Sequence, residues 1–272
     1  MQDKNSRQQL FDQIQQHVAT EAVFLIASGC IQYHHNNLFY GTAASFMQPD
    51  AYLLLTIADV ELRQCKIIQS KLENVLQAIA SVTVWCMPLS QFNEQLFKNE
   101  YFACSIWKQA ERLLIKADAS FAAPSLPTVP HDCQQEWYQR ASAFFAGAEL
   151  FIIRKQYTMA AFHLHQCAEQ AFTSIVYNAC GYRPATHNLQ LLYRYACWFA
   201  LSLHSLFPDT NLNEKHLLDL LQAAYTGSRY AHDYHVKGEQ IMALKKKVEV
   251  LLGEAAEGTG RRETEVGKTG RR

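Results

Sequence analysis

Apolar residues recur along the first half of the chain with two different spacings. Positions 6–20 are mostly polar but carry Leu10 and Ile14 four residues apart, which predicts an amphipathic helix. Two short apolar runs, at 22–31 and 51–57, are bounded by turn residues. Runs of this kind predict buried strands.

Beyond residue 60 the same half alternates helical and strand patterns. Helical spacing covers 61–79, β-branched and aromatic residues at 82–87 favour a third strand, and 89–114 is typical of one or two helices. The order helix, strand, strand, helix, strand, helix predicts a small α/β domain over residues 1–117.

The second half shows helical spacing throughout. Gly181 and Gly227 follow apolar stripes and are expected to end the second and fourth helices. Short loops between amphipathic helices predict an all-α, up-and-down bundle of five helices over 134–252, so that the whole chain is of the α+β class. The expected helices are 134–153, 157–178, 186–203, a fourth from 209 or 213 to 225, and 239–252.

Two segments of unusual composition flank this bundle. Pro124, Pro127 and Pro130 recur every third residue, which excludes helix and predicts an extended linker over 118–133. Residues 253–272 contain a single branched apolar side chain. They cannot bury enough surface to offset their ordering entropy, so we expect a disordered tail.

Composition narrows the possible functions. The chain has 272 residues with 25 basic and 25 acidic side chains, so it has no overall field that would attract nucleic acid or an anionic membrane. The 8 cysteines show no metal-binding spacing, and no apolar stretch is long enough for a secretory signal or a membrane span. We expect a cytoplasmic protein with free thiols, no cofactor and no bound metal.

Candidate chemistry is concentrated between the fourth and fifth expected helices. Residues 229–235 read Arg-Tyr-Ala-His-Asp-Tyr-His, which combines a fixed cation, two imidazoles, a carboxylate and two phenols. Such groups bind phosphate and transfer protons. A structural alternative is that Arg229 pairs with Glu169 or Asp233 while Tyr230 and Tyr234 pack beneath the last helix.

Three segments of the second half together resemble the HEPN domain family. The segment 160–172 is similar to the second helix of the family, with Gln166 and Glu169 at its recurring polar positions. The segment 182–189, Tyr-Arg-Pro-Ala-Thr-His-Asn-Leu, is similar to the Pro-x-Thr-His-Asp-Leu motif that begins the third helix. Residues 228–234 match the Ala-Arg-Tyr element before the last helix. The resemblance implies a five-helix bundle that forms a homodimer.

The resemblance also implies nucleotide or RNA binding and leaves the activity open. Some members are metal-independent ribonucleases in which His follows Arg after several residues; Arg229 and His235 fit that spacing and would be catalytic in an endoribonuclease of toxin or defence type. Other members bind nucleotides or act as partner domains. Tyr230 stands where ribonuclease members usually carry Asn, His or Asp, which favours the non-catalytic kind. The expected binding residues are Arg229, Tyr230, His232, Tyr234, His187 and Glu169.

The first half more distantly resembles a minimal nucleotidyltransferase domain, a fold often fused to HEPN domains. The resemblance rests on the element order and on the strand at 82–87 followed by aromatic positions at 92–102. Such enzymes need a Gly-Ser turn and an Asp-x-Asp pair for magnesium. Here the candidate turns are Ser28-Gly29 and Gly41-Thr42, and the pair is reduced to Asp50-Ala51-Tyr52. We therefore expect an inactive domain that serves as a docking surface for a protein partner.

Overall fold

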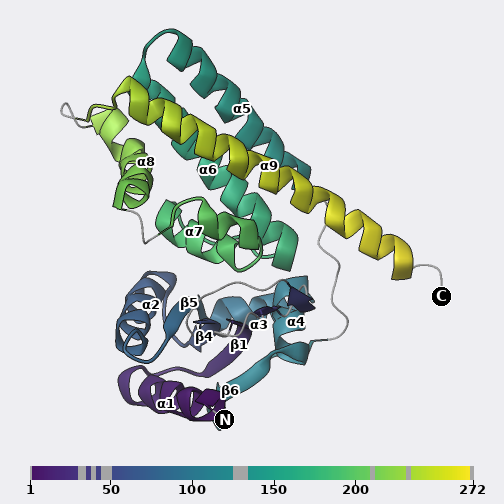
Figure 1. Cartoon of the computed structure of the whole chain (residues 1–272). Helices are drawn as coiled ribbons and strands as arrows, with labels where there is room; N and C mark the ends of the chain where they lie inside the picture. The colour runs from purple at the N-terminus through teal and green to yellow at the C-terminus, as the bar shows by residue number, and fades with distance from the viewer. Residues whose placement is uncertain are drawn as a thin grey trace. The chain divides into compact units, whose positions relative to one another are not determined.

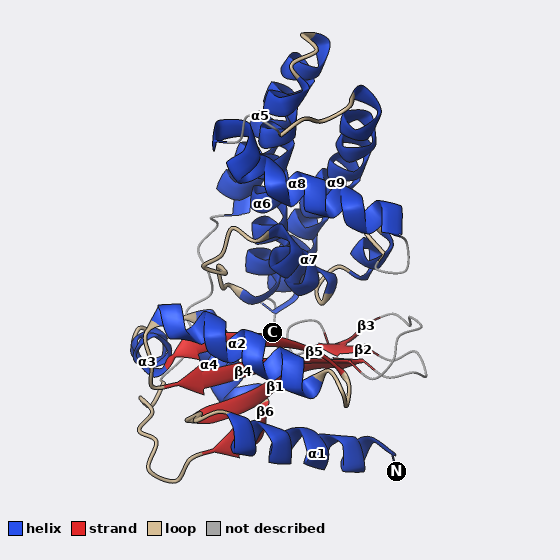
Figure 2. Cartoon of the chain, turned by 90° about the vertical axis from the view of Figure 1, so that its left-hand side faces the viewer, coloured by secondary structure: helices blue, strands red, loops and turns tan. Residues whose placement is uncertain are grey.

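The computed structural model describes residues 2–29, 35–37, 41–43, 51–124, 134–208, 212–230 and 234–269. The chain divides into two compact units, Met1–Pro130 and His131–Arg272 (Figure 1). The first unit is α/β and the second consists of helices (Figure 2). This confirms the predicted fold class. Within the described ranges no helix is both long and apolar enough to cross a membrane.

The first unit is built on a six-stranded mixed sheet. The strand order is β3-β2-β1-β4-β5, and β6 also pairs with β1. Strands β4 and β5 are parallel and are connected by α2, whereas the other pairings are antiparallel. The elements are α1 (Gln2–His17), β1 (Ala22–Gly29), β2 (His35–Asn37), β3 (Gly41–Ala43), β4 (Ala51–Ala58), α2 (Leu62–Leu76), β5 (Ser81–Pro88), α3 (Leu89–Phe97), α4 (Tyr101–Gln109) and β6 (Glu111–Ile115).

The three strands that the sequence did not predict are all short. Strand β4 pairs with one edge of β1. On the other edge of β1, β6 pairs with residues 22–25 and β2 pairs with residues 27–29. The prediction of helix as far as residue 114 is wrong. Ala110 is extended (φ −70°, ψ 144°) and ends α4, after which β6 satisfies the backbone groups of β1 that β2 leaves unpaired.

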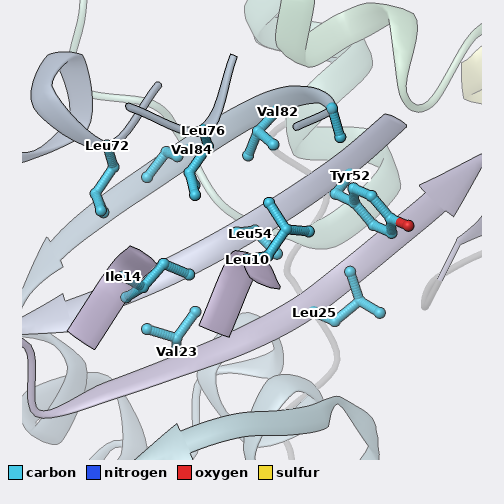
Figure 3. Packing of buried hydrophobic residues seen from close by; sticks show 11 residues of the cluster. Leu10, Ile14, Val23, Leu25, Tyr52, Leu54, Leu72, Leu76, Val82 and Val84 are labelled. Carbon is cyan, nitrogen blue, oxygen red and sulfur yellow. The ribbon is translucent and has the colours of Figure 1, made fainter. Parts of the chain in front are cut away.

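The two faces of this sheet are covered by different helices. On one face, alternate residues of the central strands pack with α1 and α2 (Figure 3). On the other face, the ring of Phe24 lies 5.9 Å from that of Phe92 in α3 and 6.2 Å from that of Trp107 in α4. Residues of the first face include Leu10, Ile14, Val23, Leu25, Tyr52, Leu54, Leu72, Leu76, Val82 and Val84.

The second unit contains five α-helices among its described residues, and α6 is central. It packs against α5, α7, α8 and α9, and 16 of its 24 residues are buried. Gly181 ends α6 in the left-handed conformation (φ 74°), as the sequence predicts. The elements are α5 (Gln134–Ile153), α6 (Tyr157–Cys180), α7 (Leu189–Cys197), the 3₁₀ helix η1 (Leu201–Ser205), α8 (Leu212–Tyr230) and α9 (Gly238–Thr269).

The predicted ends of α7 and α9 differ in the structure. Helix α7 stops at Cys197, and a separate 3₁₀ turn follows before residue 206. Helix α9 continues past residue 252, where the sequence predicts its end, and Ala255 is fully buried. Apolar contact therefore extends further than the composition of this segment indicates. Disorder at the very end of the chain stays a prediction.

Candidate functional site

Arg229 lies in the last turn of α8 and not in a connector. The prediction that Gly227 ends this helix is wrong, because α8 continues to Tyr230. The side chain of Arg229 is exposed, and its Nε–H donates to the backbone oxygen of Tyr225 at 2.9 Å. Its guanidinium carbon lies 4.1 Å from the ring centroid of Tyr225 and 5.6 Å from that of Phe162. Aromatic contacts thus orient a cation that remains at the surface.

Gly227 allows close packing instead of ending the helix. A Cβ built at this position would lie 2.5 Å from Cγ of Tyr234. Tyr234 is half-buried and its hydroxyl donates to the backbone oxygen of Leu220 at 2.9 Å. Burial raises the pKa of the Tyr234 phenol. A glycine inside a helix costs about 1 kcal/mol relative to alanine. The close approach of Tyr234 to α8 explains why Gly227 is nevertheless found there.

His187 reaches the same region from the segment that precedes α7. Asn188 is the N-cap of α7, and its side chain accepts from the backbone N–H of Leu191 at 3.0 Å. The hydroxyl of Thr186 accepts from the N–H of Asn188 at 3.2 Å. His187 lies between these two capping residues, and its Nδ1 is 2.9 Å from Oε1 of Glu169.

The carboxylate of Glu169 is buried, with only 6% of the residue exposed. Burial alone would raise the pKa of this carboxyl group. The neighbouring imidazoles of His165 and His187 lower it by more than burial raises it, so that the pKa lies below its ordinary value. Because an ionised carboxylate only accepts hydrogen bonds, Nδ1 of His187 must carry the donated proton. The side chain of His187 is 64% exposed, which leaves Nε2 as its ring nitrogen for a ligand.

His165 lies beside the carboxylate of Glu169, inside the bundle. The residue is fully buried, and its Nδ1 lies 3.0 Å from the backbone oxygen of Leu221. Since a carbonyl only accepts, Nδ1 carries the proton. The other ring nitrogen lies 3.7 Å from Oε2 of Glu169. His165 and Glu169 thus form one buried polar group on the α8 side of α6.

Tyr225 connects the exposed groups with the buried ones. Its ring lies 5.2 Å from that of His165 and 6.0 Å from that of His187, and the planes of Tyr225 and His187 are almost parallel, at 6°. From the sequence, Tyr225 is expected only as the last residue of the fourth helix. The missed signal is that Tyr225 precedes Arg229 by four residues, one helical turn. We define the Tyr225 cluster as Phe162, His165, Glu169, His187, Tyr225 and Arg229.

The other predicted site residues follow Arg229 in the chain. His235 is exposed. Tyr230 is the last residue of α8, but its side chain lies outside the described part of the structure, as do His232 and Asp233. Of the two acidic partners considered for Arg229, Glu169 faces imidazoles instead.

His163 lies on a different face of α6 from His165, as their spacing predicts. Its ring is 5.9 Å from that of Phe144, 4.9 Å from that of Phe151 and 5.8 Å from that of Phe162. Burial lowers the pKa of the His163 imidazole.

Among the described residues no group of three or more His, Cys, Asp or Glu side chains could hold a metal ion.

The candidate phosphate-binding and metal-binding residues of the first unit do not form a recognisable site among the described residues. Ser28 and Gly29 are the last two residues of β1, and Gly41 and Thr42 are the first two of β3; each pair borders residues outside the described part of the structure. Asp50 lies outside the described residues. An open cleft of about 600 Å³ lies at the carboxyl ends of the parallel strands β4 and β5. Its lining residues are Asp59, Val60, Glu61, Leu62, Gln64, Pro88 and Ser90.

Comparison with known proteins identifies the second unit. Residues 134–257 match the model of the HEPN domain family. The protein TT1696 from Thermus thermophilus is 19% identical, with a TM-score of 0.33; the match covers 46% of this chain and 97% of that one. A nucleotidyltransferase-like protein from Exiguobacterium sibiricum is 13% identical, with a TM-score of 0.33, over 98% of this chain and 80% of that one. A comparison with curated protein sequences finds no match.

Proposed function

Since residues 134–257 form a HEPN domain, we propose that this domain binds a nucleotide or RNA through Arg229 and His187. The observation that carries the proposal is that the exposed guanidinium and the exposed imidazole both lie against the ring of Tyr225. Two hydrogen-bond donors beside one aromatic ring suit a ligand that combines phosphate with a flat base.

The chemistry of each group supports phosphate binding. A guanidinium donates two parallel hydrogen bonds to a phosphate, and it keeps its charge at all physiological pH values. Nε2 of His187 donates a hydrogen bond when the ring is doubly protonated, while Nδ1 faces the carboxylate of Glu169. His235 is exposed beyond the end of α8 and supplies a further imidazole. Tyr230 and His232 belong to the proposal on the sequence alone, and Tyr234 bonds the backbone of α8 through its hydroxyl.

The binding test uses the full chain with fluorescently labelled single-stranded RNA and, separately, with ATP and GTP. Arg229→Ala should weaken binding by about ten-fold or more, the size expected for a lost hydrogen bond to a charged group. His187→Ala should weaken it by a smaller factor. Arg63→Ala is the matched control, because Arg63 is exposed on α2 of the other unit. Equal affinities for the wild type and Arg229→Ala would refute the proposal.

A second candidate function is metal-independent RNA cleavage. It is favoured by the exposure of both Arg229 and His235, which five residues separate in the chain. The guanidinium would hold the scissile phosphate while the imidazole moves protons during attack by the 2′-hydroxyl. Labelled RNA incubated in EDTA should then be cut, and Arg229→Ala or His235→Ala should abolish cleavage. Binding without cleavage supports the first function alone; the absence of both indicates an interaction scaffold.

For the first unit we infer an inactive nucleotidyltransferase-like domain that docks a protein partner. Its support is that the two candidate phosphate-binding pairs, Ser28-Gly29 and Gly41-Thr42, fall within strands. We also infer that the protein is a cytoplasmic homodimer. Incubation with labelled ATP and Mg²⁺ should give no nucleotidyl transfer, and light scattering should give twice the chain mass.

A further inference from the structure

A second group of cations surrounds Trp137 of the HEPN domain, and none of its members is among the residues proposed above. The guanidinium carbon of Arg183 is 4.5 Å from the ring centroid of Trp137, and that of Arg140 is 5.2 Å from the same ring. Trp137 belongs to the first turn of α5, and Arg183 lies between α6 and α7. We call Trp137, Arg140 and Arg183 the Trp137 platform.

The platform carries an excess of positive charge. Arg140 has a carboxylate partner, since its guanidinium lies 3.2 Å from Oε2 of Glu136. Within the described ranges, Arg183 has no carboxylate or carbonyl partner, and its side chain is exposed. Like charges repel, so two guanidinium groups share one indole only because the ring and Glu136 compensate for that repulsion. One cation remains available.

The contact with the indole ring restricts the Arg183 guanidinium and favours ligand binding. A guanidinium that lies over an aromatic ring uses its face, while its N–H groups point along the edges. Those edges are the groups that bind phosphate oxygens in pairs. Because the indole already restricts the Arg183 side chain, less rotamer freedom is lost when a phosphate binds.

The platform is also close along the chain to the proposed site. Arg183 and His187 are four residues apart in the segment before α7. Four extended residues span at most about 14 Å. One flexible single strand of RNA could therefore contact both Arg183 and His187 of the Tyr225 cluster.

We propose that the Trp137 platform is a second phosphate-binding subsite, which makes single-stranded RNA longer than a few nucleotides the ligand of this domain. The inference rests on the function proposed above. Exposed guanidinium groups beside aromatic rings are typical of single-strand binding. With 25 basic and 25 acidic residues the chain has no general attraction for RNA, so the strand must be held by such local groups.

The test compares a labelled single strand of about 12 nucleotides with a dinucleotide. Arg183→Ala should weaken binding of the long strand about five-fold, because one exposed ion pair is lost. The slope of log affinity against log salt should also fall by about 0.7, the contribution of one phosphate contact. Binding of the dinucleotide should not change. Arg183→Lys keeps the charge but loses the planar stack, and should have an intermediate affinity.

Arg154→Ala is the matched control. Arg154 is exposed just beyond the other end of α5 from Trp137, and its removal should change neither the affinity nor the salt slope. Unchanged long-strand affinity and slope in Arg183→Ala would overturn the platform, while loss of binding in Arg229→Ala would still uphold the proposed function. If Arg183→Ala weakens binding and Arg229→Ala does not, the platform stands and the proposed function fails. If the wild type binds neither strand, both fail.

Discussion

At the scale of single residues, Glu169 determines the geometry of the Tyr225 cluster. Its carboxylate is buried in α6 between a fully buried imidazole, His165, and an exposed one, His187. A buried charge is tolerated only when partners compensate its desolvation. Removing Glu169 would therefore leave His165 without its acidic neighbour and His187 without the bond that fixes its ring.

Glu169→Gln should change the acid sensitivity of the fold. The folded pKa of Glu169 is lowered, so its contribution to the free energy of unfolding is present above the unfolded pKa, about 4.3, and is lost as pH falls through the folded value. Urea unfolding of both proteins should show Glu169→Gln less stable at pH 7 by about 1–3 kcal/mol. The difference should shrink below about pH 4.3. A constant difference across this range would contradict the assignment.

Three polar members of the cluster could be predicted from the sequence, but His165 and the two aromatic members, Tyr225 and Phe162, could not. Arg229, His187 and Glu169 are charged or titratable residues in segments that resemble a family pattern. Tyr225 and Phe162 occupy apolar positions of helices, where an aromatic ring is usually a core residue. Only the three-dimensional packing of α6 against α8 shows that these rings contact Arg229.

At the scale of elements, the end of α8 depends on how closely Tyr234 approaches it. The helix passes through Gly227 because that residue leaves space for the tyrosine ring. A sequence pattern cannot distinguish this use of glycine from helix termination, since both place glycine near the end of an apolar stripe. The same glycine thereby determines that Arg229 is presented from a helix.

Two glycine substitutions separate helix propensity from packing. Gly227→Ala should lower the free energy of unfolding, because the new Cβ would lie 2.5 Å from the Tyr234 ring near its attachment to the backbone. Gly253→Ala, in α9 with nothing within 4 Å of its new Cβ, should raise it by about 0.5–1 kcal/mol. Chemical denaturation measures both changes. Equal stabilisation of the two variants would rule out the packing role of Gly227.

Long periodic helices could be predicted better than short strands. The bounds of α5 agree with the pattern because one helix of 20 residues carries several turns of apolar spacing. Strands β2 and β3 have three residues each, too few for any period to be recognised. Strand β6 forms because it pairs with an edge of β1. Since β1 lies far away in the sequence, the local pattern at 111–115 does not reveal this pairing.

At the scale of the whole molecule, the two units have separate cores. The sheet of the first unit is covered by its own helices, and α6 is surrounded by the helices of the second unit. A unit with its own core is expected to fold alone. The fold class could be predicted because the first half mixes helical spacing with short apolar runs, whereas the second half shows helical spacing throughout.

The fragment 131–272 should fold without the first unit. We expect a helical circular dichroism spectrum, a single cooperative thermal transition, and the RNA affinity of the full chain, since the residues proposed to bind RNA all belong to this unit. Full-length protein serves as the control for affinity. A fragment that shows no cooperative transition would contradict the independence of the two cores.

The caps at the start of α7 have a consequence for ligand encounter. Thr186 and Asn188 flank His187 in the chain, and their side chains accept hydrogen bonds from the backbone N–H groups of Asn188 and Leu191, while Glu169 holds the His187 ring. The imidazole is thus preorganised, and the entropy of placing it was lost when the chain folded. Association should accordingly need no loop closure around this histidine, and its rate would be governed by diffusion and by the electrostatic attraction of phosphate.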